Sequence, residues 1–373
     1  MKNIVTTYLK ERYPLTKVGS TKETYHITLT SETLEFKPGD SLGIYAQNDP
    51  GLVEHLIEAL GATGEESITD TRSGQLFSLR AFLTHKANLS RLTSALLKLI
   101  YECDLDHQEK NRLSHLLDRE NQGELKHYLD SHDPLDLFKE YRQARPPLQE
   151  ICSKFGPLLP RFYSVASSLL VHPGKVDLTV ALFTYTHSGE RRYGVASHFL
   201  CHLAEESTPI PVYVQPAHRF ALPTERDAPI VMIGPGTGIA PFRAFMQERV
   251  FHGSKGKNWL FFGERNQAYD YLYGEFWKEL AEKNLLHLSL AFSRDQEHKI
   301  YVQDRMREAG ADLWAWLQEG ALFYICGDAS HMARDVEHAM IEIFQVHGSM
   351  SEEEAKTLFK HLKKEGRYLT DVY

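Results

Sequence analysis

The sequence is poor in cysteine and has no long apolar run. Its 373 residues contain four cysteines that form no CxxC pair. That scarcity argues against a zinc site or a disulfide framework, and it predicts reduced thiols in a cytoplasmic protein that holds no metal. No apolar run approaches the ~20 residues that span a bilayer, and residues 1–8 lack an apolar signal core. We therefore expect neither membrane association nor secretion.

Basic residues are outnumbered by acidic ones, with 42 Lys and Arg against 50 Asp and Glu. The formal net charge is -8 and the sequence pI is about 6.2. Nucleic acid is therefore not expected as the main partner, because phosphate neutralisation requires a basic face. With 42% hydrophobic and 25% charged residues, the composition is that of a globular protein without extensive disorder. The length allows two or three domains.

The pattern of residues changes along the chain. Short apolar alternations in the first 50 residues predict antiparallel strands, residues from about 51 to 147 show helical spacing, and strand patterns return from 148 to 225. We expect one β domain over residues 1–225 with a helical insertion, because neither β half alone could bury a sheet face. The strand candidates in this part are residues 24–29, 161–165 and 176–183.

The remainder, residues 226–373, alternates apolar strands with helical patterns. The strands are apolar nearly throughout, as in parallel sheets covered on both faces. This predicts a doubly wound parallel-sheet domain that binds a nucleotide. The strand candidates here are residues 229–233, 258–262, 287–292 and 322–326.

A glycine-rich segment, Gly234–Pro241, follows the first of these strands and precedes a helical pattern. Glycines such as Gly236 let backbone approach a pyrophosphate closely, and Thr237 adds a hydroxyl. The spacing departs from GxGxxG, so a tight turn in an ordinary α/β protein is the alternative.

Polar and cationic residues follow the third strand. Ser293 and Arg294, then Lys299 and Tyr301, stand where a site for NAD would place an acidic residue against the ribose 2′-hydroxyl. A guanidinium and an ammonium suit a 2′-phosphate instead. The alternative is an exposed charged loop, but the position after the strand favours the phosphate.

Three further features are ambiguous by themselves. Arg161–Ser164 could place an aromatic ring, a cation and a hydroxyl against a flavin, or it could be a plain strand. Cys326 could lie beside a nicotinamide, although a buried cysteine is more often a packed hydrophobe. A terminal Tyr373 is ordinarily without function, because chain ends fray.

Taken together and in order, these motifs resemble the ferredoxin-NADP reductase superfamily, and specifically its diflavin branch, over nearly the whole chain. That branch includes NADPH-cytochrome P450 reductase and the flavoprotein subunit of NADPH-sulfite reductase, and the ending Asp371-Val372-Tyr373 is most similar to the latter. The resemblance implies an antiparallel FAD-binding β-barrel with a helical insertion, followed by the NADP-binding domain. It implies an NADPH-dependent flavoprotein oxidoreductase with FAD and NADPH as cofactors.

The resemblance also implies a role for each matching residue. Arg161 and Ser197 would hold the FAD pyrophosphate, Tyr163 would stack on the flavin, and Tyr185 would lie on the adenine side. The full implied FAD set is Thr84, Arg161, Phe162, Tyr163, Ser164, Thr179, Val180, Ala181, Tyr185, Gly194, Val195, Ala196 and Ser197. Val195 and Ala181 stand where the family often has glycine.

For NADPH the implied set lies in the second domain. It comprises Gly236, Thr237, Ser293, Arg294, Lys299, Ile300, Tyr301, Val302, Gln303 and Asp335. Ser164, Cys326 and Asp371 would surround the reacting atoms, and Tyr373 would cover the flavin until NADPH displaces it. Hydride would then pass directly between two rings, so the protein mainly positions them.

The resemblance leaves the electron acceptor open. The family's fused proteins carry an N-terminal FMN domain, for which we find no site in this sequence, so we expect a separate partner: a sulfite reductase haemoprotein or a flavodoxin-like FMN protein. A flavodoxin or cytochrome P450-type reductase module is the alternative. A protein that binds NADP without turnover is disfavoured, because the residues implied at the nicotinamide are present.

Overall fold

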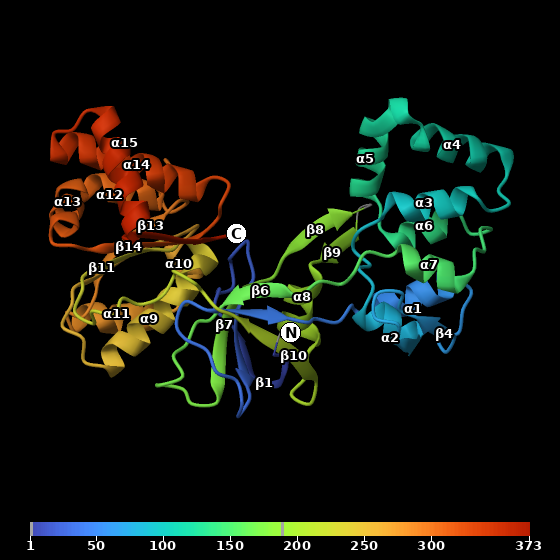
Figure 1. The fold of residues 1–373 in the computed structure, drawn as a ribbon, viewed down its shortest axis with the longest axis horizontal. Helices are drawn as coiled ribbons and strands as arrows, with labels where there is room; N and C mark the ends of the chain where they lie inside the picture. Colours follow the sequence, from blue (N-terminus) through green and yellow to red (C-terminus); the bar gives the residue numbers. More distant parts are fainter. Residues whose placement is uncertain (1–2, 188–189) are drawn as a thin grey trace. The chain divides into compact units, whose positions relative to one another are not determined.

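The computed structural model describes residues 3–187 and 190–373 (Figure 1). The chain forms two compact units, each built from separate stretches of sequence. We call them the sheet unit and the helical unit. The sheet unit comprises the residues up to Gly43, Phe162–Ala181 and Glu206–Tyr373. The helical unit comprises Ile44–Arg161 and Leu182–Glu205.

An antiparallel sheet of six strands contains the strands expected in the first part of the chain. Its order is β6-β3-β10-β1-β2-β7, so strands from both sides of the helical insertion pair with one another. The residues expected at 24–29 form β2, in which Ile27 and Leu29 are fully buried. The strands are β1 Val5–Pro14, β2 Thr24–Thr30, β3 Ser41–Ile44, β6 Arg161–Ser164, β7 Lys175–Ala181 and β10 Pro209–Gln215.

A second sheet of five parallel strands contains all four strands expected after residue 226. Its order is β13-β12-β11-β14-β15. The fifth strand, β15, was not expected; it pairs with β14 at the edge of the sheet. The strands are β11 Ile230–Ile233, β12 Asn258–Glu264, β13 His287–Phe292, β14 Leu322–Gly327 and β15 Tyr368–Val372. A mixed α/β fold with a six-stranded antiparallel sheet and a five-stranded parallel sheet is thus confirmed.

Both faces of the parallel sheet are buried. In β11, Val231 and Ile233 belong to one hydrophobic cluster, and Ile230 and Met232 belong to another. Because side chains alternate along a strand, the two clusters lie on opposite faces. Helices α12 to α15 pack on one face and α9 and α11 on the other (Figure 1). The helices of this part are η3 Gly236–Ile239, α9 Ala240–Phe251, α10 Gln267–Asp270, α11 Gly274–Glu282, α12 Val302–Glu308, α13 Gly310–Gln318, α14 Met332–Gly348 and α15 Glu352–Glu365.

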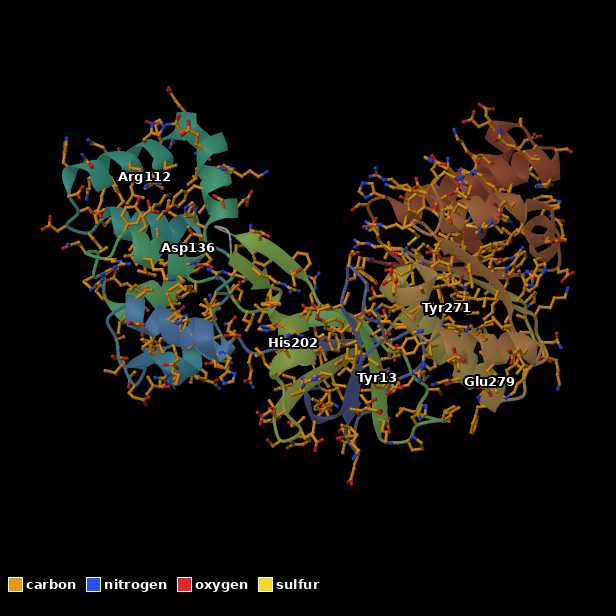
Figure 2. All side chains as sticks on the ribbon, turned by 180° about the vertical axis from the view of Figure 1, so that it is seen from behind. Tyr13, Arg112, Asp136, His202, Tyr271 and Glu279 are labelled. Carbon is orange, nitrogen blue, oxygen red and sulfur yellow. The ribbon has the colours of Figure 1, made fainter. Side chains whose placement is uncertain are left out.

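The helical unit has a hydrophobic cluster of its own, formed by buried residues between Val53 and Phe155. Several of its helices begin at side-chain caps; Asp106 and Asp133, for example, form capping boxes. The elements are α1 Pro50–Ala59, α2 Leu79–His85, α3 Ser94–Tyr101, α4 His107–Leu117, η1 Arg119–Asn121, α5 Gln122–Ser131, α6 Pro134–Glu140, α7 Leu148–Lys154, α8 Val195–His198, the π-helix η2 Phe199–Leu203, and the strands β4 Ser67–Thr69, β5 Leu76–Ser78, β8 Thr184–His187 and β9 Glu190–Tyr193. Figure 2 shows the side chains, with Arg112 on this unit and Glu279 on α11 of the sheet unit.

Two details of the expected pattern are wrong. Residues 148–154 form helix α7 and not a strand, because Leu148, Ile151 and Cys152 recur at helical spacing and pack into the helical cluster. The helical insertion also contains a short hairpin, β4–β5. Within the part of the chain that the structure describes, no helix is both long and apolar enough to cross a membrane.

Candidate functional site

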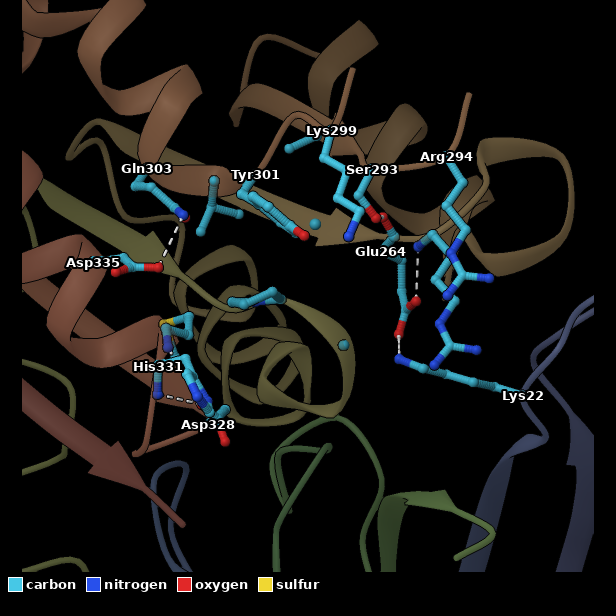
Figure 3. A pocket seen from close by; sticks show the side chains of 17 residues that line it. Lys22, Glu264, Ser293, Arg294, Lys299, Tyr301, Gln303, Asp328, His331 and Asp335 are labelled. Atoms are coloured by element: carbon cyan, nitrogen blue, oxygen red, sulfur yellow. Dashed lines mark hydrogen bonds and ion pairs between the residues drawn. The ribbon is translucent and has the colours of Figure 1, made fainter. Parts of the chain in front are cut away.

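A pocket of about 590 Å³ lies at the carboxyl edge of the parallel sheet (Figure 3). In parallel α/β sheets this edge is where ligands bind, because the loops after the strands converge there. In Figure 3, Gln303 and Asp335 lie toward one end of the pocket, and Arg294, Glu264 and Lys22 toward the other. The lining residues are Lys22, Pro235, Gly236, Gly263, Glu264, Arg265, Ala291, Ser293, Arg294, Lys299, Tyr301, Val302, Gln303, Asp328, His331, Met332 and Asp335.

The structure brings together most residues predicted for the nucleotide. Gly236, Ser293, Arg294, Lys299, Tyr301, Val302, Gln303 and Asp335 all line this pocket. Gln303 donates a hydrogen bond to the Asp335 carboxylate at 3.2 Å. Ile300 is not in the lining; it packs against the hydrophobic cluster that also contains Val302.

The cationic end of the pocket fits a phosphate. The Asp295 carboxylate accepts hydrogen bonds from Asn266 and Gln267 at 2.9–3.1 Å, so it is held by groups other than the neighbouring Arg294. Among the described residues, neither Arg294 nor Lys299 forms an ion pair. Two exposed cations beside the hydroxyls of Ser293 and Tyr301 are a donor set suited to a phosphorylated ribose.

The glycine-rich segment is shaped by the strand beside it. Gly236 has φ +60°, a left-handed conformation that favours glycine. A Cβ on Gly238 would lie 2.1 Å from the Cys326 carbonyl oxygen, so only glycine permits this approach to β14. The segment is a 3₁₀ turn, η3, leading into α9. The residues after Gly234 therefore present backbone at the pocket edge.

A second cluster lies at the carboxyl end of β14 and β15. Cys326 and Asp371 are direct partners across these strands. Ser164 donates a hydrogen bond to the Asp371 carboxylate at 2.8 Å, and the Cys326 sulfur lies 3.9 Å from the same oxygen. Burial raises the pKa of Asp371, and the hydrogen bonds from Ser164 and Cys326 only partly offset this. Burial, followed by the charge of Asp371, also raises the pKa of the Cys326 thiol.

Tyr373 extends this cluster. Its backbone N–H donates to the Gly327 carbonyl at 3.1 Å, and its hydroxyl lies 2.7 Å from the Thr237 hydroxyl. The Tyr373 side chain is exposed, at 62% of its maximum. The sheet unit thus brings together all four residues predicted to act at the reacting atoms, although their roles stay a prediction.

The residues predicted for FAD fall in both units. In the sheet unit, Tyr163 and Ser164 are half-buried in β6, while Phe162 is exposed and contacts Tyr213 edge-on. Thr179 and Val180 are buried in β7, and Ala181 ends that strand. An aromatic ring, a hydroxyl and a strand edge are groups that can contact a flavin ring.

In the helical unit, the hydroxyl of Ser197 is fixed by local contacts. It donates to the Gly194 carbonyl and accepts from the Phe183 N–H, both at 3.1 Å. Gly194 caps the short helix α8, which contains Val195 and Ala196. Arg161 is exposed and lies at the start of β6, a strand of the antiparallel sheet. An exposed guanidinium is suited to the predicted role, which is to bind the FAD pyrophosphate.

Tyr185 and Thr84, the other two residues of this unit that were predicted to contact FAD, have local partners. Tyr185 lies in β8 opposite Arg192, and burial raises the pKa of its hydroxyl. Thr84 donates its hydroxyl to the Arg80 carbonyl, one turn back in α2. The hydrogen bond of the Thr84 hydroxyl is therefore made within helix α2.

Sequence reasoning missed several pocket residues. Lys22 and Glu264 form an ion pair at 2.5 Å although 242 residues separate them. Glu264 could have been found, because it follows the predicted strand 258–262 by two residues, much as Ser293 follows the predicted strand 287–292. Lys22 lies in the turn between β1 and β2, and no local pattern marks it.

Within the described residues no cluster of three or more His, Cys, Asp or Glu could hold a metal ion.

Comparison with known proteins agrees with this geometry. The FAD binding domain family matches residues 1–199, and the oxidoreductase NAD-binding domain family matches residues 232–338. Relatives in three bacteria carry the name sulfite reductase [NADPH] flavoprotein alpha-component. The Bacillus subtilis protein is 41% identical over 95% of this chain, that of Photorhabdus laumondii 39% over 96%, and that of Vibrio cholerae 38% over 99%.

This chain spans 58–59% of the length of those relatives. The expected resemblance to the diflavin branch is confirmed, as are the expected class of enzyme and its use of FAD with a nicotinamide nucleotide. The chain belongs to the family of flavoprotein oxidoreductases in which an FAD binding domain is followed by an oxidoreductase NAD-binding domain.

Proposed function

We propose that this chain takes hydride from NADPH onto FAD and passes the electrons to a separate acceptor protein. The observation that carries the proposal is the hydrogen bond between Ser164, on a strand predicted to contact the flavin, and Asp371, beside the predicted nicotinamide position. That bond brings the residues assigned to two cofactors to one point. Hydride transfer requires such a juxtaposition, because the reacting rings must touch.

The nucleotide would bind in the pocket at the carboxyl edge of the parallel sheet. Arg294 and Lys299 would hold the 2′-phosphate, with Ser293, Tyr301 and Gln303 as hydrogen-bonding partners. Gly236 and Thr237 would contact the pyrophosphate, and Asp335, hydrogen-bonded to Gln303, would close the far side of the pocket. The unpaired cations support NADPH in preference to NADH.

The FAD contacts proposed are the residues that the resemblance implies. Tyr163, Ser164 and the strand Thr179–Ala181 would contact the ring, with Phe162 beside them. Arg161 and the segment Gly194–Ser197 would hold the pyrophosphate, Tyr185 would lie on the adenine side, and Thr84 would lie near FAD. The support for this set is the match to the FAD binding domain family together with the residue types.

The chemistry itself belongs to the cofactors: when bound, the reduced nicotinamide supplies a hydride and the flavin accepts it. The Ser164 hydroxyl carries one proton, which is donated to Asp371 in this structure and could be donated to the reacting edge of the flavin instead when FAD is bound. The Asp371 carboxylate favours the positive charge that develops on the nicotinamide side. The Cys326 thiol beside Asp371 carries no charge, because its raised pKa keeps it protonated. Tyr373 would shield the site from water until the nucleotide displaces it.

We place the FAD-binding domain at residues 1–225, with its helical insertion at about 51–147, and the NADP-binding domain at 226–373. We also propose that the antiparallel sheet closes into a barrel. Support comes from Val165, the residue after edge strand β6, which bridges Leu178 in the opposite edge strand β7. The Ala166 N–H also donates to the Asp177 carbonyl at 2.7 Å.

For the acceptor we propose a sulfite reductase haemoprotein, reached directly or through a flavodoxin-like FMN protein, in the cytoplasm. The names of the relatives support this assignment. A general flavodoxin or cytochrome P450-type reductase would share the same cofactor residues, so the acceptor must be tested separately from the cofactors.

The decisive experiment is an anaerobic titration of the purified chain with NADPH, after its flavin has been identified and quantified from the visible spectrum. We expect stoichiometric FAD that bleaches with NADPH and much less readily with NADH. A chain that binds no FAD, or whose FAD is not bleached, would refute the proposal. Reduction of ferricyanide without reduction of a sulfite reductase haemoprotein or a flavodoxin would remove only the acceptor assignment.

A further inference from the structure

A buried polar cluster in the sheet unit shares no residue with the pocket lining or with the group around Asp371. We call it the Asp177 cluster; it consists of His26, Thr28, Asp177, Thr179, Arg243 and Tyr273. Asp177 and Thr179 are on β7 and face Thr28 and His26 on the neighbouring strand β2. These four residues are at most 5% exposed. Arg243 and Tyr273 come from the nucleotide-binding half, on α9 and directly before α11.

Asp177 is the charged centre of the cluster. Arg243 Nη1 donates to its carboxylate at 2.8 Å and to the Ala166 carbonyl at 2.6 Å. Thr28 donates to the other carboxylate oxygen at 2.8 Å. His26 Nε2 lies 3.5 Å from that same oxygen. Burial alone raises the pKa of Asp177, but the hydrogen bonds and charges of His26 and Arg243 outweigh it, so the carboxyl is held as the carboxylate.

Tyr273 attaches the cluster to the start of α11. Its hydroxyl lies 3.0 Å from His26 Nδ1 and 2.8 Å from the Thr179 hydroxyl, and the Arg243 guanidinium lies 4.9 Å from its ring centre. Tyr273 has φ 54° and ψ 31°, a left-handed conformation that costs a tyrosine free energy. Such a conformation persists only where the surrounding contacts determine it.

The cluster connects the two parts of the chain that the reaction must align. Thr179 belongs to the strand assigned to the flavin, and Ala166 follows Ser164 by two residues. Arg243 lies in the first turn of α9, directly after the glycine-rich turn Gly236–Ile239. Further along α9, Gln247 accepts from the Ser168 N–H at 2.9 Å, so the same helix holds the segment after β6 at a second point.

We propose that Arg243, Asp177 and Tyr273 are positioning residues, which fix the flavin-contacting strands relative to the glycine-rich turn so that the two rings meet at hydride-transfer distance. The inference rests on the proposed function. A buried ion pair is a poor source of stability, since a well-packed apolar contact of the same volume would do as well. Charge-assisted hydrogen bonds differ from apolar contacts in being directional, and this fixes one relative placement of the groups that they join.

The test compares variants that separate stability from placement. Arg243→Met leaves Asp177 buried without its arginine partner, so this variant unfolds more easily. The double variant Asp177→Asn/Arg243→Met removes both charges and regains stability. Tyr273→Phe removes one hydroxyl and keeps the ring. Arg249→Met is the matched control: Arg249 lies on the same helix, is 4% exposed and donates to Ala228 within the nucleotide-binding half, so it joins nothing across the two halves.

Two readouts are needed. The first is the single-turnover rate of flavin bleaching at saturating NADPH, measured with protiated and deuterated nicotinamide to isolate the hydride step. We expect Tyr273→Phe and the double variant to retain FAD and NADP⁺ binding yet to lose about tenfold or more in this rate. The second readout is hydrogen exchange of the cofactor-free chain, in which β7 and the first turn of α11 should exchange faster in the double variant but not in Arg249→Met.

If the hydride-transfer rate recovers in the double variant together with its thermal midpoint, the cluster is only a stabilising contact and the proposal is wrong. It is equally wrong if Arg249→Met slows the rate as much as the double variant does. If NADPH does not bleach the FAD of the wild-type chain, the proposed function is refuted instead. The hydrogen-exchange comparison would still decide whether the Asp177 cluster joins β7 to the start of α11.

Discussion

The hydroxyl of Ser164 and the carboxylate of Asp371 meet at 2.8 Å although 207 residues separate them in the chain. One is on the edge strand of the antiparallel sheet, and the other is on the edge strand of the parallel sheet. Their hydrogen bond therefore reports directly on how the two sheets are placed, and both residues become the first targets for mutation.

Asp371→Asn should slow hydride transfer by about tenfold or more, because it removes the negative charge that favours the developing positive charge. It should also make the protein more stable at neutral pH. The pKa of Asp371 is raised in the folded state, so its stabilising effect is complete only below the unfolded pKa and is lost as the pH rises through the folded pKa. Thermal midpoints of both proteins from pH 3 to pH 8 should diverge only at the upper end; parallel curves would contradict the assignment.

Arg294→Ala should weaken NADPH far more than NADH, because only NADPH carries the 2′-phosphate. Losing a charge-assisted contact costs about 1.5–3 kcal/mol, or roughly 10- to 100-fold in the dissociation constant. Binding titrations with both nucleotides measure this. Arg119→Ala, an exposed change in the helical unit, is the control. An equal loss of affinity for both nucleotides would rule out the phosphate role.

Tyr373→Ala and Tyr373→Ser should increase the use of NADH, since the nicotinamide no longer has to displace the ring. Tyr373→Phe removes only the hydroxyl bonded to Thr237 and should behave nearly as wild type does. Steady-state kcat/KM for the two nucleotides gives the preference. An unchanged preference in the alanine variant would show that the ring does not cover the flavin.

Gly238→Ala should destabilise the protein and weaken nucleotide binding. Its Cβ would lie 2.1 Å from the Cys326 carbonyl oxygen, so the backbone must move, at a cost of about 1–3 kcal/mol. Gly123→Ala is the opposite case, because that helical glycine has no neighbour within 4 Å, and it should stabilise α5 by about 1 kcal/mol. Chemical denaturation of both variants compares the two directions.

The parallel sheet was readable from sequence because its strands are apolar on both faces and end in polar or glycine-rich loops. The residues at its carboxyl edge followed from the same pattern, which is why Ser293 and Arg294 could be assigned to a pocket. β15 was missed because it is five residues long and lies at the chain end, where strand pairing depends on a distant neighbour. Lys22 was missed for a similar reason: its place beside Glu264 is set by tertiary structure alone.

The roles proposed for Arg243 and Asp177 could not be predicted from the sequence either. An arginine in a helix and an aspartate in a strand are ordinary residues by local pattern. Their meaning arises only once α9 lies against β7, which no spacing in the sequence predicts. By contrast, the motifs at Arg161, Gly234 and Ser293 are contiguous, and contiguous motifs are what a single sequence reveals.

The helical unit's separate hydrophobic cluster, between Val53 and Phe155, has a calorimetric consequence. Side chains that share a cluster melt together, whereas clusters with different members can melt at different temperatures. Differential scanning calorimetry of the intact chain should show two transitions. The total calorimetric enthalpy should then exceed the van't Hoff enthalpy calculated from the steepness of either transition. Ligands that contact only the parallel sheet should then shift one endotherm and leave the other in place.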